Sequence, residues 1–216
     1  MSVKFIVYTN MQRAMNLENS NFLRDELQDE FTVAFKNEDM SFIQSLYGKL
    51  RILNRQAEYF ETESVDITDL AENICLASDI LLSNSGKSVI FCGNDVSAVL
   101  GNRQILTKAI LEAISNACIF GKGGLITVKT QEHKKFVTLE VQSMGAFKFR
   151  GGDGLSFMRK AARKSDGEML IVSHNEYSAT VFKFKKSGNI RPSRNRSFID
   201  LVSDRLSPVF IELYGV

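Results

Sequence analysis

Two short segments constrain the fold of this chain more than any other feature. The first is Leu111–Ala117, in which Glu112 and Asn116 stand four residues apart and therefore share one face of a predicted helix. The second, Gly151–Phe157, is a glycine-rich turn that opens another predicted helix. Such turns present backbone N–H groups to an anion, helped by the helix dipole. A polar pair on one helix and a phosphate-type turn before another together indicate a nucleotide site.

Composition limits the classes of protein to which the chain can belong. Its 216 residues suffice for one large domain or two small ones, and a net charge of +2 gives no strong field to recruit nucleic acid or acidic membrane. Cys75, Cys92 and Cys118 have neither metal nor disulfide spacing, which favours reduced, buried thiols in a cytosolic protein. The start lacks a signal-peptide pattern, and no apolar run reaches the roughly 18 residues that span a bilayer. We therefore expect a cytoplasmic protein that does not insert into membranes and does not bind nucleic acid.

Hydrophobic stripes predict a helical hairpin within an N-terminal segment, residues 1–64, that begins with a short β-prone run. The first helix is expected from about Asn21 to Phe35 and the second follows the polar residues 36–39. The stripes consist of Leu23, Leu27, Phe31 and Phe35 on the first helix, and of Phe42, Leu46, Leu50, Leu53, Ala57 and Phe60 on the second. These stripes need a partner, which is either the other helix, the rest of the chain or a second subunit. The last case would give a four-helix homodimer.

Residues 65–186 show a different pattern, in which helices alternate with strands. The predicted order is a helix capped by Asp66 or Thr68 that runs through Leu81, then strand Lys87–Cys92, helix Arg103–Phe120, strands Leu125–Thr130 and Phe136–Val141, helix Leu155–Lys164, and strands Met169–Val172 and Thr180–Phe184. Strands in hairpins with helices on one face indicate an α+β sandwich with a mixed sheet, rather than a parallel doubly wound sheet.

The C-terminal segment, residues 187–216, begins with a polar linker and then becomes apolar. A solvated tail would not need the side chains of Phe198–Val202 and Pro208–Tyr214. We expect this tail to dock on the domain, and a strand beside residues 3–8 is one way for it to do so.

The order of motifs between Val65 and Lys186 resembles the ATP-binding domain of sensor histidine kinases, which belongs to the superfamily of gyrase, Hsp90 and MutL. In chain order, the matching segments are Val65–Leu70 at the start of the domain, Val99–Leu106 before the N box, Leu111–Ala117 as the N box, Gly152–Leu155 as the second glycine box, and Gly167–Met169 before the next strand. One such motif is a weak signal, but five in the correct order are fairly specific. The match covers a little over half of the chain.

The resemblance implies a role for each residue of the site. Asn116 would coordinate the Mg²⁺ that bridges the phosphates of ATP, and a carboxamide oxygen is a suitable hard ligand for this ion. Glu112 would orient or activate the nucleophile. Gly152 and Gly154 would bring bare backbone close to the phosphates, and Ser143 with Gly145 would form the first glycine box, beside adenine.

Four departures from the family pattern weaken the expected activity. Ser143 stands where the family has an aspartate that accepts from the adenine amino group, and losing a charge-assisted bond of this kind costs roughly 1.5–3 kcal/mol. That loss is about one to two orders of magnitude in affinity. Met144 replaces the asparagine that usually follows this aspartate. Only residues 146–150 stand where the family has a long mobile lid. Residues 1–64 contain no histidine to accept a phosphoryl group, and His133 and His174 fall in predicted turns.

These observations favour a degenerate, histidine-kinase-like protein of a two-component signalling pathway, in effect a pseudokinase. It would act as a regulatory or scaffold module that binds a signalling partner, would bind ATP and Mg²⁺ weakly or not at all, and would dimerise through the hairpin. The alternative is an active ATP-dependent protein kinase, of the histidine or anti-sigma serine type, that phosphorylates a partner. The sequence leaves open whether the chain is an enzyme.

Overall fold

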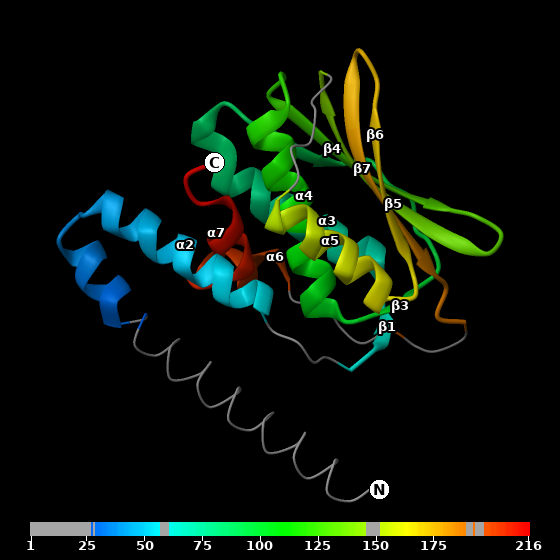
Figure 1. The fold of residues 1–216 in the computed structure, drawn as a ribbon, viewed down its shortest axis with the longest axis horizontal. Helices are drawn as coiled ribbons and strands as arrows, with labels where there is room; N and C mark the ends of the chain where they lie inside the picture. Colours follow the sequence, from blue (N-terminus) through cyan, green and yellow to red (C-terminus); the bar gives the residue numbers. More distant parts are fainter. Residues whose placement is uncertain (1–26, 28, 57–60, 146–151, 189–191, 193–196) are drawn as a thin grey trace, which may run out of the picture. The chain divides into compact units, whose positions relative to one another are not determined.

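The computed structural model describes residues 27, 29–56, 61–145, 152–188, 192 and 197–216 (Figure 1). The chain divides into two compact units, Met1–Ala57 and Glu58–Val216. Among the described residues, no helix is both long enough and apolar enough to pass through a membrane.

The first unit contains the expected helical hairpin. A helix through residues 29–36 is followed by a short turn and by α2 (Met40–Gln56). Asp39 caps α2, because its Oδ1 accepts from the backbone N–H of Phe42 at 3.0 Å and from the Ser41 hydroxyl at 2.8 Å. Both hydrogen bonds lower the pKa of the Asp39 carboxyl, and the bond from the Phe42 backbone has the larger effect.

The two helices of the hairpin meet through aromatic rings. The ring centroids of Phe31 and Tyr47 lie 4.6 Å apart in a tilted arrangement. The buried stripe of α2 consists of Ile43, Leu46, Tyr47 and Leu50. Phe42, which the spacing had placed in this stripe, is instead 38% exposed. The prediction was therefore wrong for Phe42, whose place in the stripe Ile43 takes, and right for Leu46 and Leu50. The side chains of Leu53, Ala57 and Phe60 lie outside the described residues.

The second unit is built on a mixed sheet of five strands, in the order β2-β4-β5-β7-β6. The first pair, β2 (Ser88–Phe91) and β4 (Leu125–Glu132), is parallel, and the remaining pairs are antiparallel. The other strands are β5 (Phe136–Met144), β6 (Glu168–Ser173) and β7 (Tyr177–Lys185). Both hairpins expected from the sequence, β4–β5 and β6–β7, are present. The predicted mixed sheet is thus confirmed.

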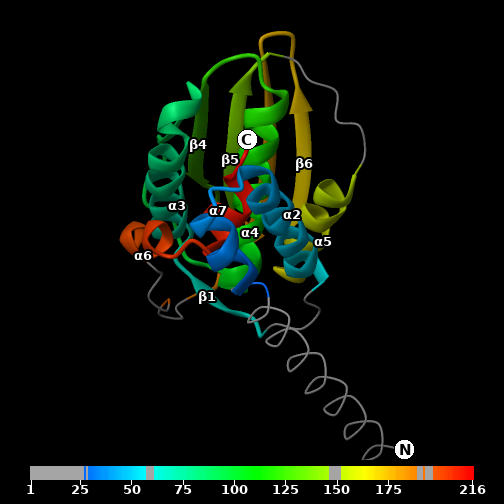
Figure 2. The same cartoon turned by 90° about the vertical axis from the view of Figure 1, so that its left-hand side faces the viewer.

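Three long helices lie over one face of this sheet: α3 (Ile67–Leu82), α4 (Arg103–Phe120) and α5 (Asp153–Lys164) (Figures 1 and 2). A short 3₁₀ turn, η1 (Ser83–Ser85), follows α3. Alternate strand residues point toward the helices, so that Val128 and Val141 pair across β4 and β5 and are both buried. Asp66 caps α3 through the backbone N–H of Asp69, and Asn102 caps α4 through that of Ile105. These caps fix where the two helices begin.

A second, smaller sheet was not expected from the sequence. It pairs β1 (Glu63–Val65) with β3 (Val99–Gly101) in antiparallel register. The pair joins the start of the second unit to the segment that leads into α4.

The tail folds as two short helices, α6 (Phe198–Ser203) and α7 (Pro208–Leu213), so the expectation of a strand was wrong. Helix α6 packs on α3, and α7 packs on both α3 and α4. Leu201, Val209 and Leu213 are buried in the core of the unit. Phe198 also donates its backbone N–H to Asn73 Oδ1 on α3 at 2.8 Å. Residues 3–8, the expected strand partner, lie outside the described residues.

Candidate nucleotide site

Helix α4 holds the polar pair that the sequence placed on one helix face. Glu112 is buried, with 6% of its surface exposed, and Asn116 is half-buried. The Nδ2 atom of Asn116 lies 3.5 Å from Oε1 of Glu112, to which it donates. The i, i+4 spacing therefore brings the carboxylate and the carboxamide together, as expected from the helical repeat.

The first turn of α5 approaches this pair closely. A Cβ atom at Gly154 would stand 1.7 Å from Glu112 Oε1, so that only a glycine leaves room for the carboxylate. A carboxylate beside the start of a helix is stabilised by the helix dipole. Gly152, the N-cap of α5, differs, because a Cβ atom there would meet no described residue within 4 Å. The structure thus brings Glu112, Asn116 and Gly154 together, but no close contact with a described residue requires glycine at position 152.

The end of β5 holds the residues expected beside adenine. Ser143 faces the helical layer, is only 2% exposed, and its Oγ has no hydrogen-bond partner among the described residues. Met144 alternates to the other side of the strand and is 61% exposed, so it does not fill the space that Ser143 faces. Gly145 has a φ of 85°, a left-handed conformation that glycine adopts without strain.

A glycine that sequence reasoning had treated only as a helix stop also belongs to this region. A Cβ atom at Gly121, which follows α4, would stand 2.8 Å from Ser143 Oγ. Gly121 comes five residues after Asn116, about 7.5 Å further along the helix axis. The hydroxyl of Ser143 therefore lies against the C-terminal end of α4, about a turn and a half beyond Asn116. The sequence offered one signal for Gly121, the run of glycines at 121–124.

These residues fit the two ends of a bound nucleotide unequally. The Asn116 carboxamide is a suitable oxygen ligand for Mg²⁺, and it donates to Glu112, which itself lies against Gly154 of the phosphate-type turn. The unpartnered hydroxyl of Ser143 offers one neutral hydrogen bond and no charge. In the described part of the chain, no cluster of three or more His, Cys, Asp or Glu side chains could hold a metal ion by itself. The expected short lid, residues 146–150, lies outside the described residues.

The remaining reactive side chains do not join this site in the described structure. Burial raises the pKa of the Cys118 thiol to about 11 and also raises that of Cys75. Cys92 is exposed, so the expectation that it is buried was wrong. His133 and His174 stand in the turns of the two hairpins, where their rings stack on Phe136 and Tyr177.

Comparison with known proteins gives a fold but no close relative. No protein-family model matches the chain, and no curated protein matches it. Among solved structures, the Acinetobacter baumannii histidine kinase AdeS matches with a TM-score of 0.57 and 13% identity, over 80% of this chain and 98% of that one. The ATP-binding domain of PrrB from Mycobacterium tuberculosis matches with a TM-score of 0.52 and 18% identity, over 60% and 100%. The chain has the fold of a histidine kinase ATPase domain.

The histidine-kinase-like fold confirms the resemblance drawn from the order of the motifs. Full-length ShkA in complex with AMPPNP also matches, with a TM-score of 0.61 and 15% identity, over 84% of this chain and 47% of that one. At these identities the likeness establishes the fold, and any chemistry of the site depends on the residues that this chain carries.

Proposed function

We propose that this chain is a histidine-kinase-like signalling module that regulates or scaffolds a partner and binds ATP and Mg²⁺ weakly or not at all. The observation that carries the proposal is Ser143, at the position where the family's aspartate would meet adenine, because its buried hydroxyl has no partner among the described residues. A neutral hydroxyl provides less binding energy than a carboxylate for the same amino group.

The phosphate end gives no comparable argument for weak binding. Glu112 lies against Gly154, in the first turn of α5, and the resemblance gives this residue a role in the family's own reaction. The proposal of weak ATP binding therefore rests on the adenine end of the site.

Isothermal titration calorimetry with ATP and Mg²⁺ tests the proposal. We expect a Kd weaker than about 1 mM for the natural chain, and a gain of about one to two orders of magnitude for Ser143→Asp, which restores a charged acceptor. Ser143→Asn is the matched control, because it has the same size without the charge and should gain little. Thermal melts of the variants check that each one folds. Micromolar binding by the natural chain would defeat the proposal.

A second candidate function is an active protein kinase that phosphorylates a partner. The observation that favours it is the assembly of Glu112, Asn116 and Gly154 at one place. Incubation with labelled ATP and purified candidate partners separates the two functions. Transfer that is abolished by Asn116→Ala would support the kinase and overturn the regulatory module.

We further propose that the module is a cytoplasmic homodimer joined through its N-terminal hairpin. Apolar side chains that remain exposed on the hairpin support this arrangement: Val33, Met40, Phe42 and Ile52. Exposed apolar groups of this kind favour association with another surface.

A further inference from the structure

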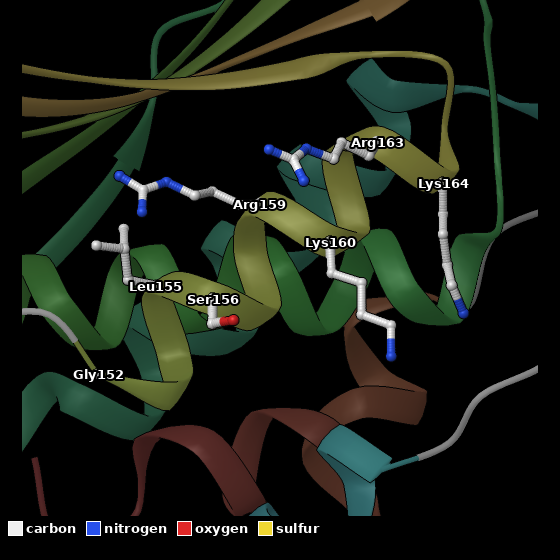
Figure 3. A pocket seen from close by; sticks show the side chains of 7 residues that line it. All are labelled: Gly152, Leu155, Ser156, Arg159, Lys160, Arg163 and Lys164. Atoms are coloured by element: carbon white, nitrogen blue, oxygen red, sulfur yellow. The ribbon is translucent and has the colours of Figure 1, made fainter.

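Helix α5 concentrates positive charge on its exposed side. Arg159, Lys160, Arg163 and Lys164 are all exposed, and Asp153 is the helix's only acidic residue, so α5 carries a net charge of +3 (4 − 1). The whole chain carries only +2. Together with Gly152, Leu155 and Ser156, the four cations line a surface pocket of about 530 Å³ (Figure 3). We call these four cations the α5 basic face.

The cations form two rows along the helix. In Figure 3, Arg159 and Arg163 extend to one side of α5, and Lys160 and Lys164 extend to the other. Each row has i, i+4 spacing, at which like charges repel and weaken a helix. The helix dipole favours the two cations of the last turn, but Arg159 and Lys160 lie a full turn earlier. Helix stability therefore does not explain the α5 basic face.

The acidic residues just after α5 are paired with another element. Asp166 lies 3.8 Å from Lys185 on β7, and Glu168 lies 2.5 Å from Lys183 on the same strand. Within the part of the chain that the structure describes, Arg159, Lys160 and Arg163 form no ion pair. Their charge is thus available to an anion from another molecule.

We propose that the α5 basic face docks a carboxylate-rich segment of a partner protein, a proposal that rests on the proposed function as a partner-binding module. The twelve residues of α5 span about 18 Å, which matches a short acidic helix or strand. The face is short, because exposed Asp153 precedes it and the ion pairs of Asp166 and Glu168 with β7 follow it. A short acidic peptide matches this length, whereas a flat anionic membrane or a nucleic-acid duplex extends well beyond it.

The composition of the pocket also favours a protein partner. Leu155 offers an apolar contact beside the cations, and arginines with apolar neighbours are typical of protein interfaces. No aromatic side chain lines the described pocket, although aromatic stacking is a common way of holding the bases of single strands.

Fluorescence anisotropy with the full chain and a labelled peptide of alternating glutamate and alanine tests the proposal at low salt, without ATP. The test variant is Arg159→Ala with Arg163→Ala. The matched control is Lys134→Ala with Lys135→Ala, which removes the same charge from exposed positions in the β4–β5 turn. We expect the α5 pair to weaken peptide binding by about tenfold or more and the control pair to change it by less than about twofold. Alanine is a strong helix former, so the α5 variant should fold, which circular dichroism checks.

The same measurements can overturn the proposal. Equal losses in both pairs, or no peptide binding at all, would show that α5 is not a specific docking surface. Tighter binding of an oligothymidine strand or an anionic vesicle than of the peptide, lost in the same α5 variant, would show that the face binds another polyanion and not a protein partner. If ATP bound with micromolar affinity and the peptide bound as expected, the proposal of weak ATP binding would be wrong and the proposed docking surface would still be supported.

Discussion

Gly154 determines where the carboxylate of Glu112 can lie. Because Gly154 has no Cβ atom, Oε1 of Glu112 can approach the backbone of α5. A Cβ atom at this position would lie only 1.7 Å from Oε1. Because Glu112 is only 6% exposed, its carboxylate cannot simply swing into water when it is displaced. One missing side chain on α5 therefore sets the conformation of a charged residue on α4.

We predict that Gly154→Ala destabilises the protein by about 1–3 kcal/mol, because it displaces a buried charged group from its hydrogen bonds. In a Glu112→Ala background the clash disappears, and the same substitution should be neutral or stabilising by up to about 1 kcal/mol, since alanine favours helix. Urea denaturation of the four proteins of this double-mutant cycle measures the coupling. An equal loss in both backgrounds would show that Glu112 is not the cause.

Local spacing predicts only part of the site at this scale. The four-residue interval between Glu112 and Asn116 predicts their shared face, because the helical repeat is a local property. The contact of Gly154 with Glu112, and that of Gly121 with Ser143, join segments far apart in the chain. Tertiary packing sets such contacts, and no periodicity in the sequence encodes them.

Among the elements, short segments show most clearly where pattern reasoning stops. Helices α6 and α7 have six residues each, too few for apolar spacing to distinguish a helix from a strand. The stronger signals were local: Ser197 and Asp200 form a capping box, and Pro208 begins α7. The three-residue strands β1 and β3 have even less pattern, and only their pairing defines them.

The helices of the tail should contribute to stability in proportion to what they bury. Leu213→Ala is expected to cost about 2–5 kcal/mol, because its side chain is 2% exposed and lies in the core of the second unit. Ile199→Ala, at a position 58% exposed in the same tail, should change stability by less than about 0.5 kcal/mol. Thermal melts of both variants compare the two losses. A small effect of Leu213→Ala would mean that the tail does not hold the core together.

For the whole molecule, the sequence predicts the order of elements better than their arrangement. Helix α4, Arg103–Phe120, has the predicted bounds, and each strand of the two hairpins extends a predicted strand by a few residues. No apolar pattern indicated the place of β2, which pairs parallel with β4 at one edge of the sheet. Long-range strand pairing depends on how the helical layer packs, which single segments do not reveal.

The state of association is the prediction that belongs to the whole molecule. If the hairpin forms a homodimer, multi-angle light scattering should give about twice the monomer mass of 24.3 kDa. Phe42→Glu with Ile52→Glu places charges on the exposed apolar side of the hairpin and should give a monomer. The matched control, Ile199→Glu, changes an exposed apolar residue of the tail and should leave the dimer intact. A monomer at every concentration of the natural chain would contradict the dimer.

The docked tail packs on two of the three long helices in the helical layer of the second unit. Helices α6 and α7 pack on α3 and α4, so the chain itself covers part of those two helices, although Leu76 and Ile80 on α3 remain exposed (Figure 2). The third helix, α5, keeps an exposed and strongly charged side. A partner that bound where the tail packs on α3 and α4 would first have to displace the tail. A partner that bound the exposed side of α5 would not. The docking that we propose for the α5 basic face is therefore compatible with a tail that stays in place.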